Sequence, residues 1–103
     1  MGIFDHLPEV DNIALDIIPG DTLRERLDSL GISAYRLSKE TKIQQTRVSK
    51  ILKGERSITV DTALRFGKFF GTSAQFWINL QINYDLKVAL EKNKGELAEI
   101  HHY

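Results

Sequence analysis

The stretch from Ser33 to Gly54, SAYRLSKETKIQQTRVSKILKG, constrains the fold of this chain more than any other. Leu37 is the apolar anchor of its first half, and Ile43 falls near its middle. The second half has apolar residues at i, i+3 and i+4, the spacing of one helix face; these are Val48, Ile51 and Leu52. Ser33 is suited to cap a helix start, and Gly54 to follow a helix end. The stretch therefore predicts two short helices, residues 34–41 and 45–53, joined by a tight turn.

The outward side chains of the second helix have the chemistry that reads base edges. Gln pairs with adenine N6 and N7, Lys and Arg favour guanine O6 and N7, and Ser and Thr contact either purine. We therefore expect six residues to face bases in a DNA major groove: Gln44, Gln45, Thr46, Arg47, Ser49 and Lys50. Four more are expected to contact phosphates: Ser33, Arg36, Lys53 and Arg56.

The charge distribution supports the same interpretation, although the whole chain, with 14 basic and 14 acidic residues, is formally neutral. Residues 33–56 hold seven basic and two acidic side chains, a net charge of +5. Residues 1–32 hold two basic and seven acidic side chains, a net charge of −5. A local cationic patch can neutralise phosphates whatever the overall charge. An ordinary helical hairpin with a solvated face would explain the charge alone, but not the charge, turn and polar face together.

Four blocks of sequence resemble the HigA-type antitoxins, a branch of the XRE-like helix-turn-helix repressors. PGDTLRE at residues 19–25 resembles the opening segment of that family, and residues 33–54 resemble its helix-turn-helix core. SIT at 57–59, followed by ALR at 63–65, resembles a third segment. GTSAQFWINLQ at 71–81, followed by YDL at 84–86, is close to the family signature GTSPEFWLNLQ…YDL and is the most specific block.

The resemblance implies an all-α fold, a five-helix domain like that of lambda repressor, with a long C-terminal helix and an irregular or short-strand N-terminal arm. It also implies an antitoxin of a type II toxin–antitoxin module. Such a protein binds operator DNA as a homodimer to repress its own operon, and binds a small basic ribonuclease toxin of the RelE-like, HigB type. Two alternatives stay open. One is a stand-alone XRE-family repressor without a toxin, and the other is a protein-interaction module whose helix pair has lost its DNA role.

Three residues depart from the family pattern. Lys42 occupies the place of the usual turn glycine, so a residue with a side chain would have to adopt a positive φ at some cost. Ser38 replaces a small alanine at the contact between the two helices, where its hydroxyl would need a partner. Gln44 replaces the usual serine cap of the second helix. These changes affect the turn geometry and the DNA sequence read rather than the fold.

Helices are also predicted before and after this pair. Residues 21–30 carry an apolar stripe formed by Leu23, Leu27 and Leu30, and Gly31 follows. For a helix at 60–70, capped by Thr59, the expected inward residues are Val60, Ala63, Leu64, Gly67 and Phe70. Gly67 there would permit close packing. The last helix starts at TSAQ, residues 72–75, which matches a capping box, and continues to about residue 92.

The expected organisation is one domain between two terminal segments. Residues 19–92 form the helix-turn-helix domain with its C-terminal dimerisation helix, and residues 93–103 form a tail. In the N-terminal arm, residues 1–18, Ile13, Leu15 and Ile17 have the period of an edge strand. The alternatives are a partly ordered segment or an acidic arm that contacts a basic partner.

The last helix has more large apolar residues than one face can hold. A face with Phe76 and Leu80 is expected to close the core, and the surplus to be covered by a second copy of the chain. The residues assigned to that dimer contact are Trp77, Leu80, Tyr84 and Val88. Two copies would also supply two reading helices for a palindrome. The alternative is a monomer that buries all of these side chains.

Other kinds of site find no support in the sequence. The chain has no cysteine, which excludes a disulfide and a thiolate metal site, and its three histidines form no ligand pattern, so we expect no metal. We expect neither catalysis nor a cofactor, because no P-loop, GxSxG, HExxH or dinucleotide motif is present. No apolar run approaches a membrane span, and the first residues lack the features of a secretory signal. A cytoplasmic location is therefore expected.

Overall fold

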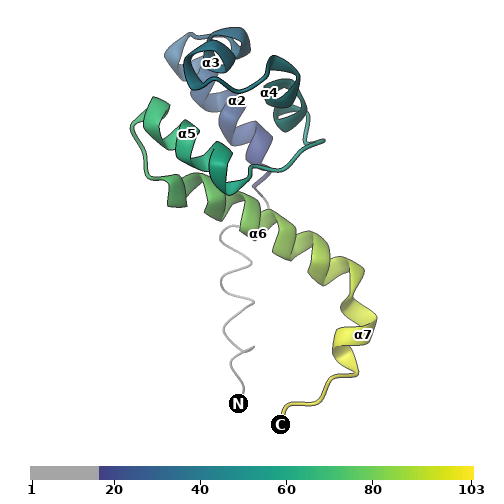
Figure 1. Ribbon diagram of the computed structural model, residues 1–103. Coiled ribbons are helices and arrows are strands. Elements are labelled where there is room, and N and C mark those ends of the chain that lie inside the picture. Colours follow the sequence, from purple (N-terminus) through teal and green to yellow (C-terminus); the bar gives the residue numbers. More distant parts are fainter. Residues whose placement is uncertain (1–16) are drawn as a thin grey trace.

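The computed structural model describes residues 17–103. In this range the chain forms six α-helices and no strand: α2 Pro19–Leu30, α3 Ala34–Thr41, α4 Gln45–Leu52, α5 Val60–Phe70, α6 Ala74–Lys92 and α7 Lys94–Ala98. Helices α2 to α5 form one body, while α6 runs along it and continues past it toward α7 (Figure 1). The all-α helix-turn-helix fold confirms the predicted class. Helix α7 lies in the predicted tail and brings the described helices to one more than the five expected.

The helix ends follow from side chains close by in the sequence. Ser33 caps α3 by accepting a hydrogen bond from the Arg36 N–H at 3.1 Å, and Thr59 caps α5, so both helices have the predicted bounds. The cap of α6 is Ser73, not Thr72 as the capping-box pattern suggested. The Thr72 hydroxyl instead accepts a hydrogen bond from Trp77 Nε1 at 2.8 Å.

The core is a single cluster of apolar side chains from α2 to α6 and the loops between them. Its buried members are Leu23, Leu27, Leu37, Ile43, Val48, Ile51, Ile58, Ala63, Phe66 and Trp77. Trp77 is fully buried, and the ring centroids of Phe66, Phe70 and Phe76 lie 5.3, 5.2 and 5.1 Å from its own. Because one copy encloses Trp77 completely, the prediction that it belongs to the dimer contact is wrong.

Several predicted core residues face solvent instead. Leu30, Val60 and Leu64 are 55, 66 and 57% exposed. Leu30 is in the last turn of α2, which ends at Gly31. In α5 the buried face is centred on Thr62 and Phe66 rather than on Val60 and Leu64, because the Thr62 hydroxyl has a partner in Thr59 and can be buried. In α6 the buried residues are Trp77 and Gln81, and Phe76 stays 37% exposed rather than closing the core.

Two glycines mark places where backbones approach closely. A Cβ on Gly20 would lie 2.5 Å from the Ile51 carbonyl oxygen and 2.8 Å from that of Leu52, so the start of α2 packs directly on the end of α4. A Cβ on Gly67 would lie 3.0 Å from backbone atoms of the α5–α6 turn. This contact confirms the close packing predicted for Gly67.

Candidate nucleic-acid interface

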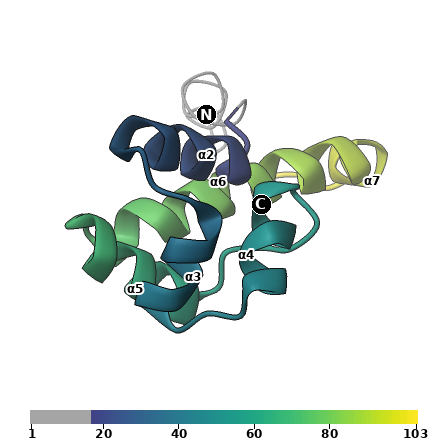
Figure 2. The same cartoon turned by 90° about the horizontal axis from the view of Figure 1, so that it is seen from above.

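Helices α3 and α4 lie on the side of the body away from α6 and are seen from above in Figure 2. Lys42 ends α3 in the left-handed region, with φ 60° and ψ 34°, which confirms the conformation predicted for this position. The buried Ser38 hydroxyl donates a hydrogen bond to the carbonyl oxygen of Ile43, and this bond supplies the partner that it needs. The turn therefore accommodates both departures from the family pattern.

The end of α4 is fixed by backbone hydrogen bonds around Gly54. The Gly54 N–H donates to the Ile51 carbonyl at 3.1 Å, and the Glu55 N–H donates to that of Lys50 at 2.8 Å. With φ 78° at Gly54, these bonds form a Schellman motif. The chain leaves α4 with Lys53, Glu55 and Arg56 exposed.

The outward face of α4 brings together four of the six residues predicted to read bases. A shallow surface hollow of about 380 Å³ is lined by Gln45, Thr46, Ser49, Lys50, Lys53 and Glu55. Gln45, Thr46 and Lys50 are exposed, and Ser49 is half-buried. Gln44, the residue before the helix, is exposed and makes no side-chain cap bond. Its amide group is thus exposed at the start of α4, although it does not line the hollow.

Arg47 is the member of the predicted set that the structure separates from the hollow. It lies two residues after Gln45, about 200° around the helix, and it does not line the hollow. Its side chain is half-buried, and its Nε atom is buried without a hydrogen-bond partner. This position favours a packing role on the flank of α4 over direct contact with bases.

The four residues predicted to contact phosphates, Ser33, Arg36, Lys53 and Arg56, are all exposed. Ser33 accepts from the Arg36 N–H, and its hydroxyl hydrogen is left to donate to an anion. Both residues are at the N-terminus of α3, where the helix dipole favours negative charge. Arg36 also pairs with Glu40 at 3.6 Å, but an exposed pair of this kind is weak and can yield to a phosphate.

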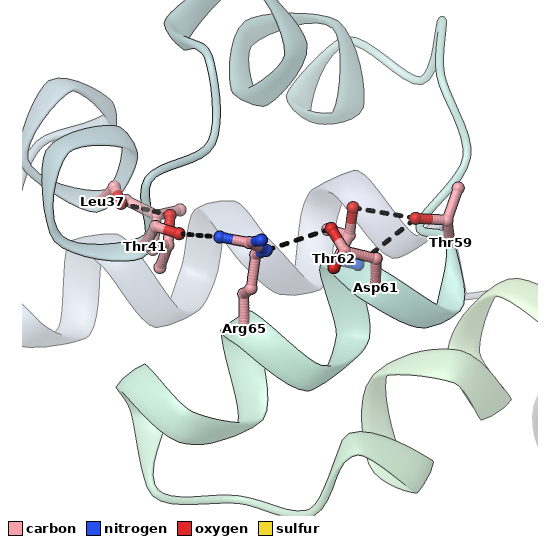
Figure 3. Close-up of polar contacts among 6 residues, drawn as sticks. All are labelled: Leu37, Thr41, Thr59, Asp61, Thr62 and Arg65. Atoms are coloured by element: carbon pink, nitrogen blue, oxygen red, sulfur yellow. Dashed lines mark hydrogen bonds and ion pairs between the residues drawn. The ribbon is translucent and has the colours of Figure 1, made fainter.

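Two residues near the interface were not singled out from the sequence. Glu55 places a carboxylate at the edge of the basic hollow. Arg65, on α5, donates from Nη1 to the carbonyl oxygen of Thr41 at 2.9 Å and from Nε to Asp61 at 3.0 Å (Figure 3). It ties the end of α3 to α5 and so sets the orientation of the helix pair. The i, i+4 spacing of Asp61 and Arg65 is visible in the sequence, whereas the Thr41 carbonyl is not.

Within residues 17–103 no helix is long and apolar enough to cross a bilayer. In the same range no three His, Asp or Glu side chains are grouped so that they could hold a metal ion.

A short helix, a tight turn and a second helix with an exposed polar face define a helix-turn-helix domain. The helix-turn-helix family model matches residues 23–77. A HigA-family addiction module antidote protein of Coxiella burnetii has 48% sequence identity and a TM-score of 0.81, over 84% of this chain and 97% of that one. The chain therefore belongs to the HigA family of helix-turn-helix proteins.

Two further relatives are similar to this chain over most of its length. The antitoxin HigA of Pseudomonas aeruginosa, solved with the higBA promoter, is 38% identical with a TM-score of 0.79, over 84% of this chain and 95% of that one. Virulence-associated protein I of Dichelobacter nodosus is 43% identical over 92 residues, which are 88% of this chain and 84% of that protein. The three relatives are thus an antidote protein, an antitoxin and a virulence-associated protein.

Proposed function

We propose that this protein is the antitoxin of a type II toxin–antitoxin module. It binds operator DNA as a dimer through α4, represses its own operon, and binds a small basic ribonuclease toxin. The polar face of α4, surrounded by a local charge of +5, is the observation that carries the DNA-binding part. A relative solved with promoter DNA and another described as an antidote protein support the proposal. A cytoplasmic location stays a prediction.

In this proposal the hollow on α4 faces the base edges of a major groove. Gln45, Thr46, Ser49 and Lys50 contact bases, and Gln44 lies beside them. Around them, Ser33, Arg36, Lys53 and Arg56 bind phosphates, which set the register of the protein on the duplex.

The distal half of α6 is the surface proposed for the dimer. Trp77, Gln81, Tyr84 and Val88 share one helical stripe, and α6 extends past the body that covers the start of this stripe (Figure 1). Tyr84 is half-buried and Val88 is 46% exposed. Leu80 is half-buried against the core, so it contributes only its remaining surface. For both copies of α4 to enter successive major grooves of one operator, such pairing must place them about 34 Å apart.

The dimer is tested by sedimentation of variants across a range of concentrations. Val88→Asp places a charge in the proposed contact and should shift the population to monomer without loss of helicity. Val60→Asp makes the same chemical change at an exposed site on α5 and should sediment like the unaltered protein. If the Val88→Asp protein remains as dimeric as the Val60→Asp protein, the proposal that this half of α6 forms the dimer interface is wrong.

DNA binding is tested by titrating the protein into labelled duplex from upstream of its own gene at several salt concentrations. The logarithm of the affinity should fall linearly with the logarithm of the salt concentration. Gln45→Ala and Lys50→Ala should each cost about 1–3 kcal/mol on the preferred site and relax the preference at one base pair. Gln75→Ala on α6 and Lys68→Ala on α5 remove the same groups from exposed positions outside the proposed interfaces and serve as controls. An equal loss on every DNA sequence would exclude base reading by Gln45 and Lys50.

The toxin part is tested by co-expression with the product of the neighbouring reading frame. A small basic protein that arrests growth alone, and that co-purifies with this chain when growth is restored, supports the antitoxin. A chain that binds its upstream DNA but rescues no such product is instead a stand-alone repressor.

A further inference from the structure

The loop between α4 and α5 carries Arg56, one of the residues proposed to bind phosphate. Glu55, Arg56 and Ser57 are all exposed, so their own side chains do not fix the path of the loop. On one side the Glu55 N–H is held by the Lys50 carbonyl. On the other side the Ile58 N–H donates to the side chain of Gln81 on α6, with 2.9 Å between Ile58 N and Gln81 Oε1. Arg56 therefore lies between two backbone amides, those of Glu55 and Ile58, that are each held by a hydrogen bond.

The second of these hydrogen bonds, from the Ile58 N–H to Gln81, fixes the side-chain amide of Gln81 in one orientation. Gln81 is only 7% exposed, and its Nε2 donates to Asp85 Oδ1 at 2.9 Å. An ionised carboxylate accepts hydrogen bonds but cannot donate them, so Asp85 pairs with the amide nitrogen and directs the amide oxygen of Gln81 to the Ile58 N–H. The Ile58 side chain, 1% exposed, fills the core beside this bond.

A crevice of about 100 Å³ lies next to the hydrogen bond from Ile58 to Gln81. It is lined by the start of α2, by the loop itself and by α6, and its walls include Gly20, Arg56, Gln81, Tyr84 and Asp85. The described loop thus has open space on the side that faces α2 and α6. The Arg56 backbone is therefore held on this side by the Gln81 bond together with the buried Ile58 side chain.

We propose that Gln81 is a positioning residue for DNA binding: through the Ile58 amide it holds the α4–α5 loop so that Arg56 reaches a phosphate. This rests on the proposed DNA-binding function. Gln81 is on α6, whose distal half is the proposed dimer surface, and so one helix both pairs the two copies and sets the phosphate contact of each.

The test compares Gln81→Met with the unaltered protein in the DNA titration and in amide hydrogen exchange. Methionine has a similar length but cannot accept from the Ile58 N–H. Exchange at Ile58 should become faster, affinity should fall roughly two- to tenfold, as for one lost hydrogen bond, and the salt slope should decrease by about 0.9, as for one lost phosphate contact. In an Arg56→Ala background the same substitution should change neither affinity nor slope, because the contact that it positions is already gone.

Two controls separate positioning from general destabilisation. Gln75→Met removes another i, i+4 side-chain bond of α6, the exposed one from Gln75 to Asn79, and should leave affinity and slope unchanged. Ala63→Gly lowers stability in the core by about 1 kcal/mol or more and should not alter the slope. Should Gln81→Met fail to fold, Asp85→Ala removes only the acceptor that orients the Gln81 amide and should change Ile58 exchange and the slope in the same directions.

The outcomes distinguish this inference from the function on which it rests. An unaltered protein without salt-dependent DNA binding contradicts the proposed function itself. Normal DNA binding with faster Ile58 exchange but an unchanged slope in Gln81→Met, or additive effects of Gln81→Met and Arg56→Ala, would overturn the positioning role alone.

Discussion

Replacing Lys42 by glycine should stabilise the protein. Lys42 is the one residue other than glycine with a positive φ in the described part of the chain. Its Cβ strains that conformation by about 1–2 kcal/mol. Glycine removes this strain but loses about 0.5–1 kcal/mol more conformational entropy on folding. The midpoints of these ranges leave an expected net gain of about 0.75 kcal/mol in the free energy of unfolding, which corresponds to a rise in Tm of about 3–6 °C for a domain of this size.

The comparison that isolates the strain is Lys42→Gly against Lys42→Ala. Both variants remove the same charge from the basic region, and Lys42 is exposed, so both lose little packing. Alanine keeps the Cβ and therefore the strained turn. Chemical denaturation of both proteins gives the difference directly. The backbone bond from the Lys42 N–H to the Ser38 carbonyl remains in both variants, so their DNA affinities should match each other. A glycine variant no more stable than the alanine variant would refute the reasoning.

Three other substitutions give separate checks. Gly20→Ala should lower stability by about 1–3 kcal/mol in a thermal melt, because the new Cβ would meet two backbone carbonyl oxygens of α4; an unchanged Tm would contradict that close approach. Thr72→Val removes the acceptor of Trp77 Nε1 and should cost about 1–3 kcal/mol in denaturant unfolding followed by tryptophan fluorescence, while a neutral result would mean that the bond adds no stability. Glu55→Gln removes an acidic group from the basic hollow and should raise the affinity of the protein for all DNA duplexes alike. A fall in affinity for the preferred site alone would instead show that Glu55 accepts a hydrogen bond from a cytosine amino group.

The parts of the fold that local chemistry decides could be predicted from the sequence. Ser33 and Thr59 cap the helices that follow them, so the bounds of α3 and α5 can be predicted from the sequence. The polar face of α4 could also be predicted, because it depends only on which residues share one side of a short helix.

The choice between competing apolar stripes could not be made from the sequence. Val60 and Leu64 fit a helical period as well as Phe66 does, and only the contact with α6 decides that Phe66 is buried and they are not. The surplus of large apolar residues on α6 predicts that Trp77 contacts a partner, yet three phenylalanine rings of its own chain surround it.

The residues that position the DNA-binding interface are the hardest to identify from the sequence. Arg65 and Gln81 bond to backbone groups of Thr41 and Ile58, which lie 24 and 23 residues away in the sequence. Every residue has such backbone groups, so no pattern of side chains reveals the pairing. Of the strand predicted for the N-terminal arm, Ile13 and Leu15 lie outside the described residues, while Ile17 is described and is not in a strand.

The two ends of α6 differ in what surrounds them. Trp77 is enclosed by rings of its own chain, whereas Val88, further along the same stripe, is 46% exposed. In the proposed dimer, a copy that dissociates therefore keeps its hydrophobic core, and dilution separates the two copies without unfolding either one. Occupancy of the operator would then follow the cellular amount of the protein at concentrations where the fold is untouched.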